Sequence, residues 1–410
     1  MSSLSQRAGG PTEAVVKMSE AVAAKGHEVS VFSPNRSAHG SWIPGHGSEG
    51  TVTPPGRPDI QGGVRIERFA VRWPARFGYS PDMAAALRRR VRDFDVAHLH
   101  ALYLHPTIAA GRICSAAGIP YLVEPHGALD PWHQRHHRFR KRVYETLFER
   151  SLLNRAAGIH YATAEEMDLA RPVGIRAPGI VVPLGVDIVE YSRLPSKGAF
   201  RARHPRLADS RLILFLGRIT PKKGLDLLVR SFAQVHEAEP NAHLVIAGPD
   251  DEGYGPRVRS EVAAHRLEPF VTFTGIVLGA QKLELLADAD VWVLPSYAEN
   301  FGLAALEALC CGLPTVLSDR VNIHKEVAGA GAGLVTPCDA NAIAEAILRI
   351  LREPDFAAGL GERARALAAT YSWDRTADLL IASYQRMAAG LSLAPEPWSR
   401  LLDGQTLFPD

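Results

Sequence analysis

Val291-Trp292-Val293-Leu294-Pro295, followed by Ser296-Tyr297-Ala298-Glu299-Asn300-Phe301-Gly302, is the stretch that decides the fold of this chain. Its first residues are apolar and end at a proline, which predicts a short buried strand. The apolar run from Leu303 to Leu309 predicts a helix buried on most sides, with Phe301 as its first residue and Asn300 as its N-cap. A buried strand that leads into a buried helix is typical of a parallel α/β sheet.

Two carboxylates lie about the entrance of this helix. Glu299 precedes it, and Glu307 follows Phe301 by six residues, which is roughly 9 Å along the axis at about 1.5 Å per residue. That distance is close to the span from a diphosphate to its ribose, and free N–H groups at Phe301, Gly302 and Leu303 would face an anion. The pair predicts a nucleotide-sugar clamp. The alternative is an acidic residue before a helix and a solvated glutamate within it.

Length and composition indicate a globular protein of two domains. The chain has 410 residues, of which 46% are hydrophobic and 22% charged, and its net charge of +2 argues against nucleic acid as a partner. No apolar run reaches the ~18 residues that span a membrane, and the first residues lack the apolar stretch of a signal peptide. We expect a cytoplasmic protein, with the inner face of the membrane as a further place of action. The four cysteines lack metal-ligand spacing and are expected to be reduced.

Strand-like and helix-like segments alternate in both halves of the chain, which predicts two doubly wound parallel sheets. In the second half we expect strands at 212–216, 243–247, 271–274, 291–294 and 315–317. We expect helices at 225–238, 257–265, 282–288 and 301–311. The segments 323–328 and 340–351 close the series on either side of 333–336. In the first half we expect helices at 13–25, 107–117 and 139–155, and strands at 28–32, 96–99, 120–124, 158–162 and 180–182. The predicted domains are residues 1–188, 189–372, and a C-terminal helix and tail at 373–410.

The beginning of the first domain departs from this pattern. A Rossmann-like half opens with an apolar strand, whereas residues 1–7 are mostly polar. A central strand is therefore expected to be missing, through a start site assigned late or a truncation. Residues 35–63 are rich in Gly, Pro, Ser and His and predict a long flexible loop.

A glycine-framed turn with cations follows the strand at 212–216. Arg218 and Lys223 lie between Gly217 and Gly224, at the carboxyl end of a parallel strand, where ligands bind. Arg218 could hold phosphate oxygens in a bidentate way and Lys223 adds a point charge. The alternative is a pair of solvated loop cations. Gly9-Gly10-Pro11 would likewise allow a phosphate near a helix entrance, or form a plain turn.

Histidines stand where two strands of the first domain end. His100 ends one strand, and His126 and Gly127 follow the next, so both imidazoles could face a sugar. His98 lies on the same side of its strand as His100 and is expected to be structural. A structural role is the alternative for the other two histidines as well.

The run from His133 to Arg142 is basic and opens the helix expected at 139–155. Such a segment could lie on an anionic membrane through Arg135 to Arg142, or receive an anionic acceptor. The alternative is a solvated helix face.

Together these motifs resemble the retaining glycosyltransferases of family 4, which have the GT-B fold. The resemblance runs through Gly9-Gly10-Pro11, Gly26-His27-Glu28-Val29, Pro125-His126-Gly127, Gly217-Arg218 with Lys223-Gly224, and the E-x7-E pair of Glu299 and Glu307. It implies two Rossmann-like domains, the first binding the acceptor and the second the nucleotide sugar, with the final helix crossing back to the first domain.

The resemblance also implies roles for single residues. Arg218 and Lys223 would neutralise the diphosphate, Glu299 would contact the donor sugar, and Glu307 would hold the ribose. The donor site would further include Asn300, Phe301, Gly302 and Leu303, with Gly10 near the diphosphate and backbone groups at Gly275 and Ile276 near the base. His126 would lie beside the anomeric carbon, with His100 and Gly127 on the acceptor side. Transfer would retain configuration, the leaving phosphate would help to deprotonate the acceptor, and no metal or other cofactor is implied.

Three functions remain open at this point. The first is transfer of a hexose from a nucleotide diphosphate sugar to a glycan or lipid-linked acceptor, in surface polysaccharide biosynthesis. The second is another enzyme on the same fold, such as an epimerase or a glycan phosphorylase, and the third is a non-catalytic nucleotide-sugar-binding subunit. The sequence does not fix the base (UDP or GDP), the sugar or the acceptor.

Overall fold

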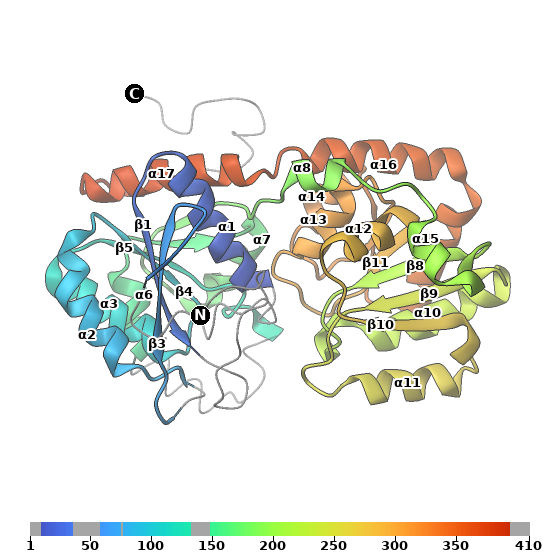
Figure 1. The fold of residues 1–410 in the computed structure, drawn as a ribbon, viewed down its shortest axis with the longest axis horizontal. Helices are drawn as coiled ribbons and strands as arrows, with labels where there is room; N and C mark the ends of the chain where they lie inside the picture. The colour runs from blue at the N-terminus through green and yellow to red at the C-terminus, as the bar shows by residue number, and fades with distance from the viewer. Residues whose placement is uncertain (1–9, 36–57, 75–76, 133–147, 394–410) are drawn as a thin grey trace. The chain divides into compact units, whose positions relative to one another are not determined.

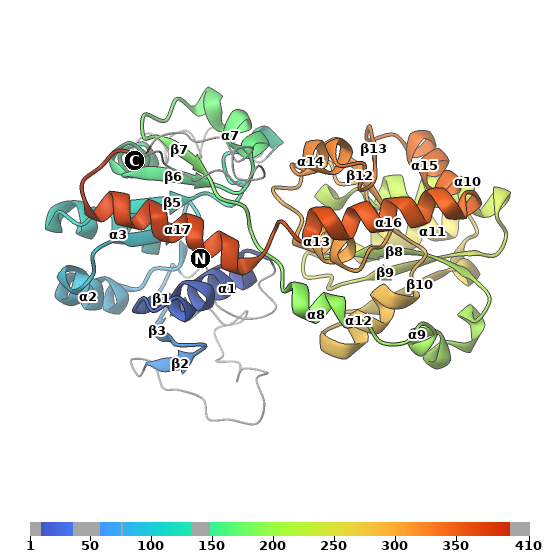
Figure 2. The same ribbon diagram turned by 90° about the horizontal axis from the view of Figure 1, so that it is seen from above.

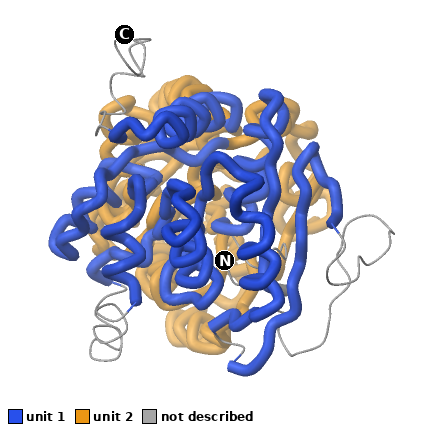
Figure 3. Tube along the Cα trace, turned by 90° about the vertical axis from the view of Figure 1, so that its left-hand side faces the viewer, with its two compact units in different colours: residues 1–185, 373–410 blue, residues 186–372 orange. Residues whose placement is uncertain are grey.

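The computed structural model describes residues 10–35, 58–74, 77–132 and 148–393. The chain divides into two compact units, shown in Figure 3. Unit 1 consists of residues 1–185 and 373–410, and unit 2 of residues 186–372. The C-terminal segment from Trp373 onward thus belongs with the N-terminal part of the chain.

Unit 2 is built on a six-stranded parallel sheet in the order β10-β9-β8-β11-β12-β13 (Figure 1). The sheet places its first strand, β8, in the centre, as in doubly wound folds. Helices cover both faces, so residues 212–216 of β8 and 291–294 of β11 are apolar. The strands are β8 (Arg211–Leu216), β9 (Ala242–Ala247), β10 (Val271–Gly275), β11 (Val291–Leu294), β12 (Thr315–Ser318) and β13 (Leu334–Thr336).

The helices of unit 2 follow the strands in alternation (Figure 1). Their bounds agree with the sequence pattern to within three residues where a helix was expected. They are α8 (Ile188–Ser192), α9 (Ala199–Arg203), α10 (Leu225–Ala238), α11 (Gly255–Ala264), α12 (Gly279–Asp288), α13 (Leu303–Cys310), α14 (His324–Gly329), α15 (Ala340–Arg352) and α16 (Pro354–Ala368).

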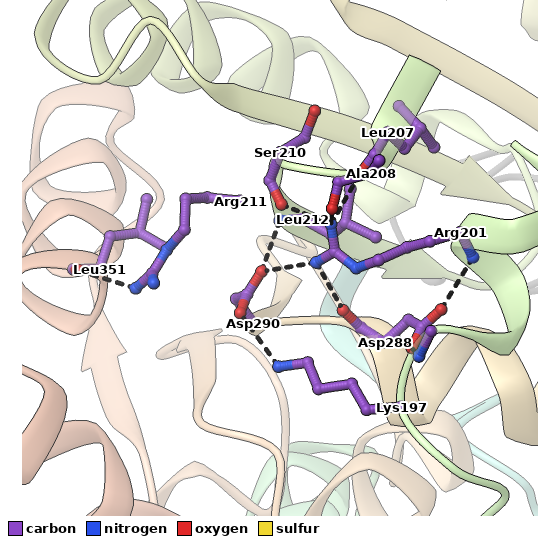
Figure 4. Close-up of polar contacts among 11 residues, drawn as sticks. Lys197, Arg201, Leu207, Ala208, Ser210, Arg211, Leu212, Asp288, Asp290 and Leu351 are labelled. Atoms are coloured by element: carbon purple, nitrogen blue, oxygen red, sulfur yellow. Dashed lines mark hydrogen bonds and ion pairs between the residues drawn. The ribbon is translucent and has the colours of Figure 1, made fainter. Parts of the chain in front are cut away.

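A polar cluster fixes the start of β8 (Figure 4). The Arg201 guanidinium donates to the carbonyl oxygens of Leu207 and Ser210 at 2.7 and 2.6 Å and to the Asp290 carboxylate at 3.2 Å. Asp290 also accepts the Leu212 N–H at 2.8 Å. Because Arg201 is on α9 and Asp290 directly precedes β11, the cluster ties the segment that enters unit 2 to two central strands.

Unit 1 contains two sheets. A four-stranded parallel sheet has the order β4-β5-β6-β7, and a three-stranded sheet has the order β1-β3-β2, with β1 and β3 parallel and β2 antiparallel to β3. The strands are β1 (Val29–Asn35), β2 (Asp59–Gln61), β3 (Val64–Ala70), β4 (Ala97–His100), β5 (Tyr121–Glu124), β6 (Gly158–Tyr161) and β7 (Gly179–Val181).

The helices of unit 1 include the C-terminal one. Lys25, which directly follows α1, pairs with Asp374 and Asp378 of α17 at 2.8 Å each. The helices α1 and α17 lie side by side in Figure 2. The helices are α1 (Gly10–Ala24), α2 (Pro81–Arg90), α3 (His105–Ala117), α6 (Arg150–Arg155), α7 (Ala164–Ala170) and α17 (Trp373–Ala388).

Several sequence-based expectations change here. The loop predicted at 35–63 contains β2 at its end, because Gly62 and Gly63 turn the chain with positive φ into β3. Of the long helix expected at 139–155, the described part holds α6, and residues 133–147 lie outside the described residues. The four cysteines are free, as expected. No helix among the described residues is long and apolar enough to cross a membrane.

Candidate active site

The turn after β8 brings two cations to the carboxyl edge of the sheet in unit 2. The turn closes with a 3-10 helix, Pro221–Lys223, and with Gly224, whose φ is +67°. A Cβ at Gly224 would lie 2.0 Å from the carbonyl oxygen of Pro295. Only glycine allows this approach, which seats the turn against the end of β11. Lys223 is thereby brought to the residues that follow β11.

Lys223 and Glu299 form a buried ion pair through Nζ and Oε2, with each side chain 12% exposed. Burial would raise the pKa of Glu299, but Lys223, Lys222 and Arg218 outweigh it and lower the pKa to about 2. Burial lowers the pKa of Lys223, and Glu299 opposes that shift. Glu299 is therefore a carboxylate at neutral pH, ready to accept hydrogen bonds and not to donate a proton.

The backbone of Glu299 is fixed from the other side. Its N–H donates to the Arg320 carbonyl oxygen at 3.0 Å, and its own carbonyl oxygen accepts the Asn322 N–H at 3.0 Å. These bonds anchor Glu299 to the segment after β12, so the carboxylate is held at the edge where the strands end.

Arg218 is the more accessible cation of the turn. Its side chain is 38% exposed, and Nη1 lies 3.9 Å from Glu252 Oε1, at the outer limit of an ion pair. A half-exposed guanidinium with one weak partner keeps donors for an anion. Arg218 and Lys223 thus differ: Lys223 is engaged with Glu299, whereas Arg218 offers donors to a ligand.

Helix α13 begins later than predicted. It spans Leu303–Cys310, with Gly302 and not Asn300 at the N-cap position. Gly302 has a left-handed φ of 86°, so the helix begins only at the next residue, and its N-cap lies two residues after Asn300. Phe301 is therefore outside the helix and buried, and the N-terminal N–H groups belong to Leu303 and Ala304. Glu307 lies about 6 Å along the axis from Leu303 at about 1.5 Å per residue.

Glu307 is buried and paired with a residue that the sequence analysis missed. Its Oε1 accepts a hydrogen bond from Lys282 Nζ at 3.0 Å, and Lys282 also donates to Tyr191 Oη at 2.6 Å. The side chain of Glu307 is 10% exposed, so the solvated alternative is wrong for this residue. Glu307 and Lys282 form a second buried carboxylate–ammonium pair on α13 and α12.

Gly275 ends β10, and Ile276 directly follows it. Gly275 has a φ of +70°, and its carbonyl oxygen accepts the Gly248 N–H at 2.8 Å. Ile276 is 46% exposed and Leu278 is 53% exposed. Two exposed aliphatic side chains at the carboxyl end of a strand give an apolar surface on which a flat ring could pack.

In unit 1, Glu124 holds the two histidines predicted at the strand ends. Glu124 is fully buried; its Oε2 lies 2.9 Å from His100 Nδ1, and its Oε1 lies 3.1 Å from His126 Nδ1. A carboxylate only accepts, so an imidazole that hydrogen-bonds to Glu124 donates from the nitrogen that faces it. Burial would raise the pKa of Glu124, but His126, His160 and His100 hold it well below 4.5. The structure thus brings His100 and His126 together, with His126 Nε2 3.3 Å from His100 Nδ1.

His98 is engaged in a separate chain of hydrogen bonds. Tyr384 of α17 lies 2.8 Å from His98 Nδ1, His98 Nε2 lies 3.3 Å from His160 Nδ1, and His160 Nε2 lies 2.6 Å from the Val182 carbonyl oxygen. The Val182 carbonyl oxygen only accepts, so His160 donates to it from Nε2. His160 Nδ1 also lies 3.4 Å from Glu124 Oε2. Burial, together with the neighbouring histidines, holds the pKa of His98 well below 6.5. Both ring nitrogens of His98 have partners in this chain of hydrogen bonds, which agrees with the structural role expected of it.

The backbone after β5 is strained towards this cluster. His126 has a φ of 53° and Gly127 a φ of 76°. The Gly127 N–H donates to Glu166 Oε1 at 2.7 Å, and the Ala162 N–H donates to Glu166 Oε2 at 2.8 Å. Glu166 is buried at the start of α7. Glu166 therefore stabilises the turn that contains His126 and Gly127. Burial lowers the pKa of His126 to about 4.

Two predicted elements lie at the limits of what the structure describes. Gly10 is the first residue of α1 and is half-buried, whereas Gly9 lies outside the described residues. The basic run from His133 to Arg142 lies outside them as well.

Among the described residues, one group could offer three metal ligands within 4.8 Å of one another: His98, His100 and Glu124. Both ring nitrogens of His98 already have partners in Tyr384 and His160. The donor set resembles that of a zinc site, but a metal would have to displace the hydrogen bonds of His98.

Two family models together match most of the chain. The model of the glycosyl transferase 4-like domain matches residues 9–185, and that of the glycosyl transferases group 1 matches residues 196–367. The chain belongs to the family 4-like glycosyltransferases. The boundary between the two matches falls where the structure divides unit 1 from unit 2.

Curated relatives of the chain include two kinds. A D-inositol 3-phosphate glycosyltransferase from Kineococcus radiotolerans is 33% identical over 223 residues, which are 50% of this chain and 51% of the relative. The chain thus spans about half the length of the curated relatives it matches in this way. A phosphatidyl-myo-inositol mannosyltransferase from Mycolicibacterium smegmatis is 25% identical over 406 residues, 94% of this chain and 92% of the relative.

Solved structures show the GT-B fold. Sucrose-phosphate synthase from Thermosynechococcus elongatus has a TM-score of 0.73 at 23% identity, over 93% of this chain and 94% of that chain. HepE of Anabaena in complex with UDP and glucose has a TM-score of 0.71 at 19% identity, over 93% of this chain and 97% of that chain. The predicted fold class, two Rossmann-like α/β domains of the GT-B type, is confirmed.

Sequence reasoning missed five residues of the site: Lys282, Tyr191, Glu124, His160 and Glu166. Lys282, Tyr191, His160 and Glu166 contact residues that lie far from them in the sequence. No local sequence pattern reveals such contacts. Glu124 carried a signal, since a glutamate at the end of an apolar strand that leads into Pro125-His126 needs a buried partner.

Proposed function

We propose that the protein is a retaining hexosyltransferase that moves a hexose from a nucleotide diphosphate sugar to a glycan or lipid-linked acceptor, with unit 2 binding the donor and unit 1 supplying acceptor-side groups. The observation that carries this proposal is the buried pair of Lys223 and Glu299 beside the start of α13. An ammonium suits a phosphate oxygen, and the ionised Glu299 suits the hydroxyls of a sugar.

The second carboxylate fits the nucleoside part of such a donor. Glu307 is buried further along α13 and is ionically paired with Lys282, so it can accept hydrogen bonds from a ribose diol. Ile276 and Leu278 expose apolar surface at the end of β10 on which a base could pack. The relatives' names agree with a glycosyl donor, and the HepE complex contains UDP and glucose.

In the proposed reaction the bond between the anomeric carbon and the phosphate oxygen breaks, and a bond to an acceptor oxygen forms on the same face. The acceptor proton passes to the leaving phosphate oxygen, while Arg218 and Lys223 stabilise the negative charge of the diphosphate. Glu299, with a pKa of about 2, does not supply a proton. His126 is neutral because its pKa is about 4, and we assign it a place at the anomeric carbon as a hydrogen-bonding group.

We propose that no metal takes part, because Arg218 and Lys223 supply cationic charge at the end of β8 where the diphosphate would bind. Participation in surface polysaccharide biosynthesis, and a contact of Arg135 to Arg142 with anionic membrane at its cytoplasmic face, are proposed from the sequence. Two of the curated relatives act on inositol-containing acceptors by name, so a phosphorylated or lipid-linked polyol is the acceptor class to try first.

The experiment that tests the proposal begins with a thermal-shift panel of UDP, GDP and ADP and their glucose and mannose derivatives. The best donor is then incubated with candidate acceptors, and the products are identified by mass spectrometry and by NMR of the anomeric proton. We expect one nucleotide to stabilise the protein and the product to keep the donor's anomeric configuration. An inverted product would overturn retention, and a bound donor that is neither transferred nor hydrolysed would favour a binding subunit.

A further inference from the structure

The carboxylate that we propose for the ribose is held by a lysine from another helix. Lys282, on α12, donates from Nζ to Glu307 Oε1 at 3.0 Å, across 25 positions of the chain. The side chain of Lys282 is 16% exposed and that of Glu307 is 10% exposed. Removal of either partner would leave the other charge buried without compensation, so this pair is costly to break.

The ammonium of Lys282 is fixed on its other side by Tyr191. Nζ donates to Tyr191 Oη at 2.6 Å, and it lies 5.2 Å from the centroid of the Tyr191 ring, within the range of a cation–π contact. Tyr191 is 3% exposed, and its N–H donates at 3.2 Å to the carbonyl oxygen of Asp187, the N-cap residue of α8. Lys282 is therefore held between Tyr191 of α8 and Glu307 of α13. Figure 2 shows α8 beside α12 and α13.

Glu307 keeps acceptor capacity beyond this pair. Among the described residues, the hydrogen bond of its carboxylate is the one that Oε1 accepts from Lys282. A carboxylate offers about four acceptor positions, so Oε2 can accept hydrogen bonds from the hydroxyls of a ribose. Because Lys282 fixes Oε1, it also restricts the direction in which Oε2 points.

The first turn of α12 joins this lysine to the surface proposed for the base. Leu278, which is 53% exposed, is the N-cap residue of α12, and Lys282 follows it by four residues. The residue that offers an apolar face to a base and the residue that holds Glu307 are thus fixed relative to each other by one helical turn. A nucleoside requires both a base surface and a ribose acceptor at a fixed spacing, which this arrangement supplies.

We propose that Lys282 is a positioning residue for nucleoside binding, which holds the Glu307 carboxylate in place for the ribose hydroxyls. The proposal rests on the proposed function, in which Glu307 receives the ribose. Without the ammonium, the Glu307 carboxylate would lose its counter-charge and its fixed orientation, and its hydrogen bonds to a diol would weaken. A pair with a structural role alone would change the stability of unit 2 and not the recognition of the hydroxyls.

The test uses Lys282→Met, which replaces the ammonium by an apolar group on a chain of similar length. The probes are UDP, GDP or ADP, whichever raises the melting temperature most, then the 2′,3′-dideoxy form of the same nucleotide, and pyrophosphate. We expect calorimetry to show a Kd for the ribonucleotide that is higher by about tenfold or more. The Kd values for the dideoxynucleotide and for pyrophosphate should not change. In a transfer assay the KM of the donor should rise with kcat little changed, since binding common to the ground and transition states is lost.

Conservative variants and a matched control accompany this substitution. Lys282→Arg keeps a cation and should restore most of the affinity for the ribonucleotide. Lys282→Gln keeps a hydrogen-bond donor without the charge, and it replaces Lys282→Met in every comparison if the latter does not fold. Lys197→Met is the control, because Lys197 also pairs with a carboxylate of unit 2, Asp290 at 3.4 Å, but is 62% exposed. Its ribonucleotide affinity should equal that of the unaltered protein.

A double variant shows whether Lys282 acts through Glu307. Glu307→Gln/Lys282→Met should bind the ribonucleotide no more weakly than Glu307→Gln alone, because a positioning residue has no effect once its target is gone. Additive losses in the double variant would overturn the proposal. Weakened binding of pyrophosphate by Lys282→Met would overturn it as well, since the ammonium would then contact phosphate directly.

The two levels of the assignment fail in different ways. If Glu307→Gln binds the ribonucleotide normally, the proposed place of the ribose is wrong and the role of Lys282 falls with it. If Glu307→Gln is impaired and Lys282→Met is normal, the place of the ribose stands and the positioning role alone is overturned.

Discussion

Lys223 Nζ and Glu299 Oε2 are in direct contact although the two residues lie 76 positions apart. Both side chains are nearly buried, so each offsets a charge that would be costly alone. The contact joins the turn after β8 to the segment after β11. It places the cation that we propose for the diphosphate next to the carboxylate that we propose for the donor sugar.

Glu299→Ala should abolish transfer without weakening nucleotide binding. The substitution frees Lys223 for the diphosphate, so calorimetry should give an equal or lower Kd for the preferred nucleoside diphosphate. Transfer should fall by at least about 10²-fold, because the donor sugar loses its hydroxyl acceptor. Glu252→Ala is the matched control, since Glu252 is half-exposed and 3.9 Å from Arg218. Full activity of Glu299→Ala would refute the assigned role.

Glu307→Gln should weaken binding of ribonucleotides and leave pyrophosphate binding unchanged. The amide fills the same space, but a charge-assisted hydrogen bond to the ribose is lost, which is worth about 1.5–3 kcal/mol, or roughly tenfold to 150-fold in Kd. A 2′,3′-dideoxynucleotide lacks both hydroxyls and should bind the two proteins alike. If the dideoxynucleotide discriminates between them as the ribonucleotide does, Glu307 does not hold the ribose.

The stability of unit 1 should fall as the pH drops below 6.5. His126 has a pKa of about 4 in the folded protein, below the ordinary 6.5, so between these values the unfolded chain binds more protons. Folding stability therefore decreases with falling pH by up to about 3 kcal/mol from this group. Burial lowers the pKa of His98 and His100 too, which acts in the same direction.

The free energy of unfolding is measured by urea denaturation at several pH values between 7 and 4. Hydrogen exchange at β5 is then measured over the same pH range. The variant His126→Asn removes the titrating group, so it should start less stable at pH 7 and lose less stability on acidification. Parallel pH profiles of the variant and the unaltered protein would show that His126 is not the group responsible.

Chelation should not reduce transfer. We propose that Arg218 and Lys223 supply the charge at the diphosphate, so the protein dialysed against EDTA should keep its rate. The group of His98, His100 and Glu124 gives the sharpest check, since elemental analysis would detect an ion held there. A stoichiometric metal in the purified protein that disappears in His98→Asn, together with lost activity, would contradict metal-independent transfer.

Substitution of Arg138, Arg140, Lys141 and Arg142 by Ser should release the protein from vesicles that contain anionic lipid. Each basic residue near such a surface contributes about 1 kcal/mol. The double variant Arg138→Ser/Arg140→Ser is compared with Arg88→Ser/Arg89→Ser, which removes two exposed cations from α2. Equal vesicle binding of the two double variants would mean that the basic run is a solvated face.

The sequence predicted the alternating α/β pattern closely because burial on both faces makes the strands continuously apolar. The expected helix at 225–238 and strand at 291–294 agree with α10 and β11 to the residue. The start of α13 was missed because Asn300 is a good N-cap by type, whereas the actual position depends on the backbone of Gly302. Helix α2 was missed as well, since its mean hydropathy is low.

By itself the sequence determined the fold class, the order along the chain of the strands other than β2 and β3, and the identity of the charged residues at the strand ends. Local periodicity and turn residues carry that information, because they act over a few positions. Only the tertiary structure decided which charges meet: Lys223 with Glu299, Lys282 with Glu307, and Glu124 with His100 and His126. Those pairs depend on the packing of distant segments, where burial makes an unpaired charge so costly that each group must find a partner.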